Sequence, residues 1–128
     1  MQLNYEKLDV IKLLLSLSFQ ILKNMPNSYG FPSDQLKRAS LSIPLNITEG
    51  NGKFSEKDKA KFYHIARGSA TEYTAIFDAA KIMEIIDSKQ WQNGKTLLVR
   101  IVSMLCKMLL RLRLRIRSRS RSRSRISN

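Results

Sequence analysis

Hydrophobic positions recur every three or four residues along most of the chain, which is the period of amphipathic helices. The first such stretch runs from about residue 8 to residue 24 and stops before Pro26. Its expected core face is Leu8, Ile11, Leu15, Phe19 and Leu22, widened by Leu14, Leu17 and Ile21. Outside residues 111–117, no stretch has the alternation typical of a strand, so the pattern predicts an all-α protein.

A second helix is predicted over residues 33–50, with Ser33 as its N-cap. Pro44 lies inside this helix. Because proline has no N–H and its ring crowds the preceding turn, we expect a kink at Pro44 that frees the carbonyl of Ser40. Gly50 and Gly52 then supply residues suited to a helix stop.

The third predicted helix begins at Ser55, where the run Ser55-Glu56-Lys57-Asp58 resembles a capping box. Acidic residues in the first turn also suit the helix dipole. The helix is expected to end near Asp87. Its heptad positions are Ala66, Ser69, Tyr73, Ile76, Ala80 and Met83. The small residues among them let a neighbouring helix approach closely.

The fourth predicted helix starts between Trp91 and Lys95 and carries two apolar stripes. The first stripe keeps strict heptad spacing through Leu98, Val102, Leu105, Leu109, Leu112 and Ile116. The second stripe lies beside it and consists of Leu97, Ile101, Met104 and Met108. Two stripes are explained either by one wide core face or by a subunit interface. We favour the interface, because the first helix is also apolar on more than one side.

These elements predict an antiparallel up-down four-helix bundle over residues 1–117, with a Pro-kinked second helix and a basic C-terminal extension. The segment 111–117 alternates like a strand, but a helix already formed before it propagates at lower cost than a new nucleus. The helix is therefore expected to reach about Arg117. Serine and arginine alone cannot bury enough surface to become ordered. Residues 118–128 are accordingly predicted to be an Arg/Ser-rich disordered tail.

Positive charge is concentrated at the C-terminal end of the chain. The formal net charge is +13; residues 1–110 hold 15 Lys and Arg against 10 Asp and Glu, whereas residues 111–128 hold 8 Arg and no acid. Such a field favours an anionic partner, with RNA or DNA first. An acidic protein surface, an anionic lipid, or an extension without a specific role remain alternatives. The candidate nucleic-acid contacts are Arg111, Arg113, Arg115, Arg117, Arg119, Arg121, Arg123, Arg125, Lys53, Lys57, Lys61 and Arg38.

Polar residues also occupy expected core positions on the second and third helices. Asn46 and Glu49 share one helix face, as do Ser69 and Glu72. We expect these four to form a structural polar network that ties the two helices together. Carboxylate metal sites in bundles need a Glu-x-x-His pair, which neither helix has. No metal and no cofactor are therefore expected, and His64, the only histidine, has no catalytic signature around it.

The chain has one cysteine, Cys106, so no intrachain disulfide can form. Its place inside the fourth helix predicts a small core side chain. The N-terminus lacks the positive charge of a signal peptide, and the most apolar early stretch is too short to span a bilayer. A cytoplasmic protein without a membrane partner is expected. Aromatic residues in predicted loops offer either base stacking or anchoring to the core; they are Tyr29, Phe31 and Phe54.

Residues 33–86 resemble the family of small four-helix-bundle proteins encoded in 23S rRNA intervening sequences, also labelled S23-type. The family pattern S-x-P-x-N-I-x-E-G-x-G is matched by Ser42, Pro44, Asn46, Ile47, Glu49, Gly50 and Gly52. A Ser-led helix start and F-x-x-x-A-x-G-S-x-x-E are matched by Ser55, Phe62, Ala66, Gly68, Ser69 and Glu72. The match is specific for the fold, whereas the function of the family is thinly defined. The Arg/Ser tail departs from the family pattern.

Relatives of that family include the accessory variability determinant of diversity-generating retroelements. The resemblance implies a basic homopentamer that binds nucleic acid beside a reverse transcriptase and has no enzymatic activity of its own. We therefore expect a non-enzymatic nucleic-acid-binding accessory protein whose partners are RNA or DNA, further copies of itself and a reverse transcriptase. The alternative is a structural protein–protein adaptor, or an rRNA-intervening-sequence protein of undefined role.

Overall fold

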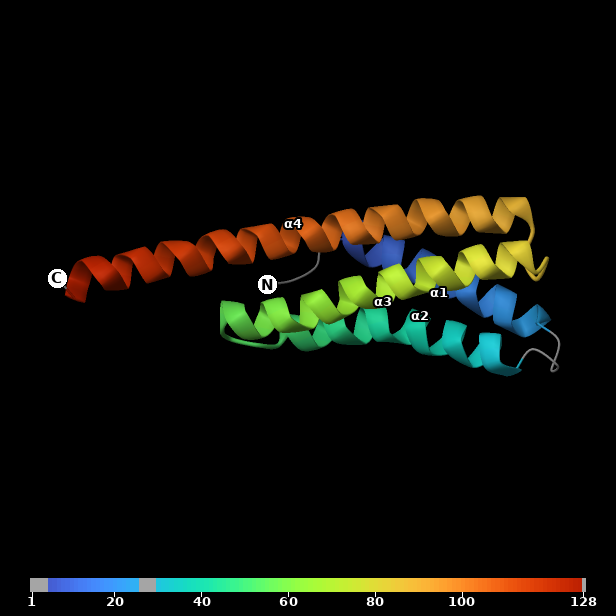
Figure 1. Ribbon diagram of the computed structural model, residues 1–128, viewed down its shortest axis with the longest axis horizontal. Coiled ribbons are helices and arrows are strands. Elements are labelled where there is room, and N and C mark those ends of the chain that lie inside the picture. Colours follow the sequence, from blue (N-terminus) through green and yellow to red (C-terminus); the bar gives the residue numbers. More distant parts are fainter. Residues whose placement is uncertain (1–4, 26–29, 128) are drawn as a thin grey trace.

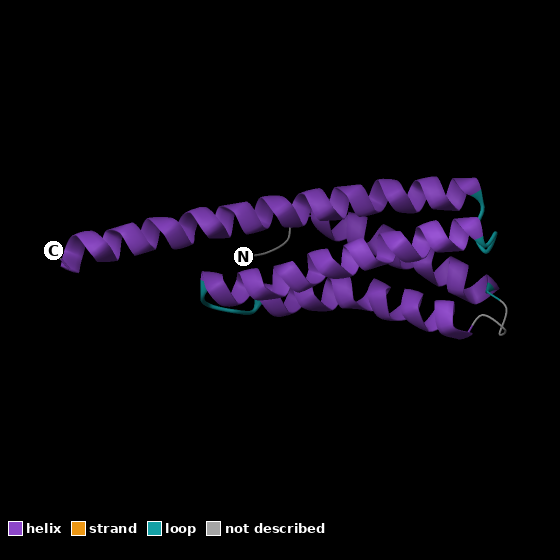
Figure 2. Cartoon of the chain, in the orientation of Figure 1, coloured by secondary structure: helices purple, strands orange, loops and turns teal. Residues whose placement is uncertain are grey.

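The computed structural model describes residues 5–25 and 30–127. This part of the chain is all-helical and contains no strand, which is consistent with the predicted four-helix bundle (Figure 2). The helices are α1 (Tyr5–Asn24), α2 (Gly30–Asn51), α3 (Glu56–Ile82) and α4 (Ser88–Ser127). Their 20, 22, 27 and 40 residues make α4 much the longest.

Each helix packs against two others, in the cyclic order α1, α2, α3, α4. Short loops join α2 to α3 at one end and α3 to α4 at the other (Figure 2). With a rise of 1.5 Å per residue, α4 is about 60 Å long. Its last turns project beyond the first turn of α3, as the red end of the ribbon shows (Figure 1).

The core of α1 keeps only part of the broad predicted face. Val10, Ile11, Leu14 and Ile21 are buried, while the predicted core residue Phe19 is 66% exposed. Between them lies a buried serine, Ser18, whose hydroxyl donates to the carbonyl of Leu14 at 2.7 Å. A polar residue therefore occupies the centre of the stripe, which the hydrophobic pattern alone did not reveal.

A hydrogen bond crosses the core between Ser18 of α1 and Tyr73 of α3. Since its own proton is given to Leu14, Ser18 accepts from the hydroxyl of Tyr73, which is fully buried. Burial raises the pKa of Tyr73 to about 12, against the lowering effect of the Ser18 contact. Tyr73 is therefore a neutral phenol in the core.

Helix α2 begins at Gly30 rather than at the predicted N-cap Ser33. Pro32 falls in the first turn, where the missing N–H has no intrahelical partner to lose and the fixed φ of proline suits a helix. Pro44 lies inside the continuous helix, and the kink there stays a prediction. At the far end, the ammonium of Lys59 donates to the carbonyls of Gly50 and Asn51 at 3.3 and 3.1 Å, which caps the last turn.

The predicted start of α3 is confirmed. Ser55 is extended and its hydroxyl accepts from the backbone N–H of Asp58 at 3.1 Å. Small residues then let α2 approach closely, because Ala66 and Ala70 have no exposed surface. At Gly50 an added Cβ would lie 2.5 Å from the ring of Tyr63, so the glycine is needed for this close contact. Helix α3 ends at Ile82, five residues before the predicted end.

Both apolar stripes of α4 enter the same core. Ile101, Met104 and Met108 of the second stripe are buried within the single chain. So are Leu98, Leu105, Leu109 and Leu112 of the first. One wide core face therefore accounts for the second stripe, and the subunit interface that we favoured is not needed to explain it.

The structure continues α4 through the tail to Ser127, where we predicted disorder from residue 118. Two physical terms account for this. Arginine is a good helix former and extends turns that the bundle has already nucleated. The guanidinium of Arg119 also donates to Glu56, in the first turn of α3, at 2.7 Å. The tail is thus an extension of a helix rather than a separate region.

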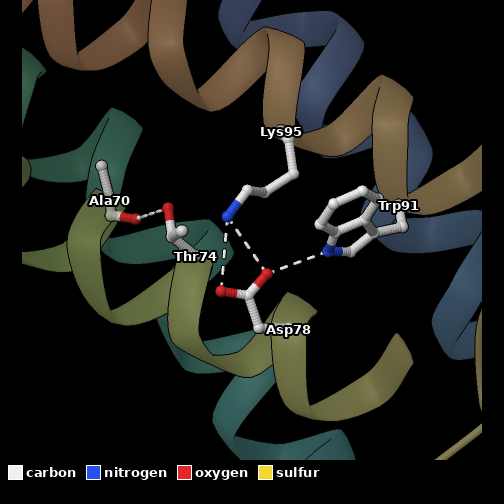
Figure 3. A network of polar contacts seen from close by, with 5 residues as sticks. All are labelled: Ala70, Thr74, Asp78, Trp91 and Lys95. Atoms are coloured by element: carbon white, nitrogen blue, oxygen red, sulfur yellow. Dashed lines mark hydrogen bonds and ion pairs between the residues drawn. The ribbon is translucent and has the colours of Figure 1, made fainter. Parts of the chain in front are cut away.

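At the opposite end of the α3–α4 contact, a polar cluster joins the two helices (Figure 3). The indole N–H of Trp91 donates to Asp78 Oδ1 at 2.9 Å, and Lys95 Nζ lies 3.1 and 3.3 Å from the two carboxylate oxygens. Lys95 also sits 5.6 Å from the Trp91 ring centroid. The hydrogen bonds from Trp91 and Lys95 lower the pKa of Asp78.

Candidate nucleic-acid interface

A groove separates the N-terminal half of α3 from the C-terminal half of α4. It encloses about 560 Å³, within the usual range of ligand sites. Its lining combines cationic and apolar side chains and contains no carboxylate. The residues are Ala60, His64 and Arg67 from α3, and Cys106, Leu109, Leu110, Arg113, Ile116 and Arg117 from α4. We call this the α3/α4 groove.

A second hollow of about 330 Å³ continues the groove past Ile116, which lines both. It is formed by Ser55, Glu56, Lys57, Ile116, Arg119, Ser120 and Arg123. Glu56 is the one acidic residue of its lining; its side chain is only 13% exposed and pairs with Arg119. The two hollows together bring Lys57, Arg113, Arg117, Arg119 and Arg123 of the predicted contacts to one side of the molecule.

Arg67 is held across the groove by contacts at both ends of its guanidinium. One nitrogen lies 3.2 Å from His64 Nδ1 and the other lies 4.0 Å from Cys106 Sγ on α4. Since arginine only donates, His64 Nδ1 is the acceptor in this geometry. The half-buried cation therefore lies at the groove, with its guanidinium between α3 and α4.

The remaining arginines are spread around α4. Arg111 lines a separate hollow of about 410 Å³ on the α1 side, together with Arg100 and Lys107. Arg115, Arg121 and Arg125 are exposed. A step of two residues turns an α-helix by about 200°, so consecutive arginines point to nearly opposite flanks. They form two rows of i, i+4 neighbours, 111/115/119/123 and 113/117/121/125.

Three of the four predicted basic contacts outside α4 have local partners. Arg38 of α2 pairs with Glu72 of α3 and donates to Gln35 at 2.7 Å. Lys53 lies 3.8 Å from Glu49, and both Lys53 and Lys61 approach the ring of Phe62. These three are not brought to the α3/α4 groove; of the four predicted sites outside the extension, Lys57 alone lines the continuous hollow.

The four residues of the predicted polar network do not form one network. Ser69 contacts Ser42 at 2.6 Å, and Asn46 donates to the same Ser42 hydroxyl at 3.0 Å, which joins α2 to α3. Glu72 instead pairs with Arg38. Glu49 is exposed and faces Lys53 of its own chain segment. The Ser and Asn members thus link the helices inside the interface, and the Glu members lie at its edge.

Three groove residues were not among the predicted contacts: Arg67, His64 and Cys106. Cys106 was expected in the core, but the structure exposes it, because the buried face of α4 is centred on Leu105 and Met108. Among the loop aromatics, Phe54 is fully exposed. Tyr29 and the side chain of Phe31 lie outside the described residues.

Among residues 5–25 and 30–127, no helix is both long and apolar enough to cross a membrane. The same residues contain no cluster of three side chains suited to hold a metal ion.

The sequence model of the 23S rRNA-intervening sequence protein family matches residues 6–107. No curated protein matches the chain. The family match covers α1, α2, α3 and the bundled part of α4, and it ends before Arg111, the first arginine of the extension. Because the match spans most of the chain, the protein belongs to the 23S rRNA-intervening sequence protein family.

Proposed function

We propose that the chain is a non-enzymatic accessory protein that binds nucleic acid through the arginines of α4. The observation that carries this proposal is the concentration of charge: 8 arginines and no acid in residues 111–128. All eight are exposed on the helix, and four of them line the hollows beside α3. Arginine pairs with phosphate bidentately, so this charge suits a polyphosphate chain better than a single acidic side chain.

The bundle supports the extension mechanically. It nucleates α4 and holds the arginines on a helix, so less order has to be created when a polyanion binds. The proposal takes the scaffold as an antiparallel up-down bundle in which Pro44 kinks α2. Residues 6–107 carry a net charge of +5, from 15 Lys and Arg and 10 Asp and Glu, so the family scaffold itself contributes the smaller share.

Titration of a labelled single-stranded RNA at several salt concentrations tests the proposal. Binding is expected to weaken steeply with salt, because each neutralised phosphate releases counterions. Arg121→Gln combined with Arg125→Gln should reduce the slope of log K against log salt by about 1.4. Glutamine keeps helix propensity, so the change removes charge and little else.

The matched control is Lys23→Gln combined with Lys89→Gln. It removes the same charge at the opposite end of the bundle, from exposed positions in α1 and α4. If binding reflected net charge alone, both double variants would weaken it equally. Binding that is absent in dilute buffer, or insensitive to salt, would contradict the proposal and favour the adaptor alternative.

Self-association is a second part of the proposal, and exposed apolar side chains support it. Leu13 is 52% exposed on α1 and lines a hollow of about 390 Å³ shared with Leu97 of α4. Phe19 and Val99 are also largely exposed. We propose a homopentamer that assembles through these faces of α1 and α4. Its proposed protein partner is a reverse transcriptase. Light scattering after size exclusion measures the mass, and a monomer at micromolar concentration would contradict the assembly.

A further inference from the structure

The α3/α4 groove is not lined as a phosphate site alone would be. Its cations stand beside an apolar floor made by Ala60, Leu109 and Ile116. Leu110 stands at its edge with 55% of its surface exposed. A phosphodiester backbone is polar throughout and gains nothing from covering these side chains. A ligand suited to the groove therefore carries an apolar surface as well as negative charge.

Charge is present on both walls of the groove. Arg67 lies on the α3 wall, fixed between His64 and Cys106. Arg113 and Arg117 lie on the α4 wall, one turn apart, which separates them by about 6 Å along the helix axis. No carboxylate lines the groove. A ligand seated on the floor is thus within reach of cations from two helices.

Unpaired nucleotides have this combination of surfaces. In a duplex the faces of the bases are stacked inside the helix, and mainly phosphates are offered to a protein. In a single strand each base presents a π-face that stacks on apolar, aromatic or guanidinium groups, next to its own phosphate. The planar guanidinium of Arg67 is suited to such stacking.

We infer that the α3/α4 groove binds unpaired nucleotides, so that the protein seats single-stranded rather than double-stranded nucleic acid there. This inference rests on the proposed function and deepens it. Arg113 and Arg117 pair with successive phosphates, and Leu109, Leu110 and Ile116 cover a base. A duplex is held only by the arginines of the extension.

Cys106 is a built-in reporter for this site, because it is the only cysteine of the chain, is exposed and lines the groove. The test measures its rate of alkylation by a maleimide, alone and with an oligouridine strand or a blunt RNA duplex. Anisotropy titrations first give the Kd of each ligand, and each ligand is then added at ten times its own Kd. Since only free protein then reacts, the single strand should slow alkylation by about tenfold. The duplex should leave the rate within about twofold of that of the free protein.

A second thiol position is the matched control. In the double variant Cys106→Ser, Ser103→Cys, the thiol moves to the hollow on the α1 side of α4, beside Arg100 and Lys107. The oligouridine strand should leave its alkylation rate unchanged. Equal protection at both positions would mean that the strand coats α4 without a seat in the groove, and would overturn the inference.

Affinity provides an independent check. Arg67→Gln should weaken binding of the single strand by about tenfold, because it removes a charge-assisted contact and a stacking surface. Arg67→Gln should leave duplex affinity within about twofold of that of the parent. The control Arg100→Gln should leave the affinity for both ligands within about twofold. Strong single-strand binding with an unprotected Cys106 overturns this inference and leaves the proposed function standing. Absence of any binding overturns the proposed function itself.

Discussion

The two halves of α4 share one backbone conformation for different physical reasons. Residues 88–112 form a helix whose apolar face is buried, with Leu98, Ile101 and Leu105 almost inaccessible. Residues 113–127 are also helical, yet none of their described side chains is buried and Leu114 is 55% exposed. The first half is held by packing. The second is held by propagation from the first and by the Arg119–Glu56 pair, against repulsion between like charges four residues apart.

This contrast indicates where the function lies. The composition of a packed helix is explained by the core, which needs its apolar residues. An unpacked helix with an arginine at every second position has no such explanation. The comparison shows that packing accounts for residues 88–112, whereas the arginine pattern of the extension is what the proposed function would explain.

The largest expected effect separates the two halves with one type of substitution. Leu105→Asp buries a charge at a position with no exposed surface and should destabilise the bundle by about 4 kcal/mol or more. Leu114→Asp places the same charge on an exposed position and should change stability by less than about 0.5 kcal/mol. Urea unfolding followed by circular dichroism measures both. Similar losses would show that the extension packs as the bundle does.

A smaller effect tests close packing within the first half of α4. Gly94 faces the ring of Phe77 so closely that an added Cβ would overlap it. Gly94→Ala should therefore destabilise the protein by about 1–2 kcal/mol, despite the better helix propensity of alanine. Gly68→Ala is the control, because nothing lies within 4 Å of its added Cβ. It should stabilise α3 by up to about 1 kcal/mol, and thermal unfolding compares the two.

The Asp78 cluster gives a pH test of the bundled half alone. Because the pKa of Asp78 is lowered in the folded state, its carboxylate stabilises the fold above the ordinary value of 3.8. That contribution is lost as the pH falls through the lower folded-state pKa. Asp78→Asn should cost less than about 1 kcal/mol at pH 7, since the side chain is 45% exposed.

In acid well below pH 3.8 the Asn variant and the parent should have equal stability. The fluorescence of Trp91, the single tryptophan, reports the cluster directly. A constant difference between the two proteins at all pH values would show that Asp78 acts through packing and not through its charge.

The smallest effect concerns the extension. Glu56→Gln weakens the ion pair with Arg119 and should leave the global melting temperature within about 1 °C. Amide hydrogen exchange in residues 118–127 should speed up a few fold, because the extension then relies on propagation alone. Glu49→Gln is the matched control, since its partner Lys53 lies one turn away on the chain. In the Glu49→Gln variant, amide exchange in the extension should match that of the parent.

Local chemistry made much of the fold predictable from sequence. The N-cap at Ser55 needs only a hydroxyl before an acidic first turn, and the structure confirms it. Which part of the broad apolar face of α1 is most buried was harder to predict, because Leu8, Leu15 and Phe19 are as apolar as the residues that are buried. The buried face includes Ser18, whose partner Tyr73 lies 55 residues away. No local pattern carries that information.

The site was predictable in its charge and not in its shape. The arginine run gives the charge of the extension directly and predicts a polyanion partner, which stays a prediction. The groove depends on which turn of α3 lies beside which turn of α4. Arg67 meets Cys106 across 39 residues of chain, and that register is set by packing in the core. The helical state of the tail was missed for a related reason: composition argued for disorder, while a preceding folded helix and one carboxylate on α3 favoured order.

The turn of about 200° between successive arginines has a consequence for assembly of larger complexes. Under the proposed function, arginines on all flanks of the extension can contact one strand on each side at the same time, so that one protein bridges two polymers. Mixing with excess long RNA should then yield clusters, and a modest addition of salt should dissolve them.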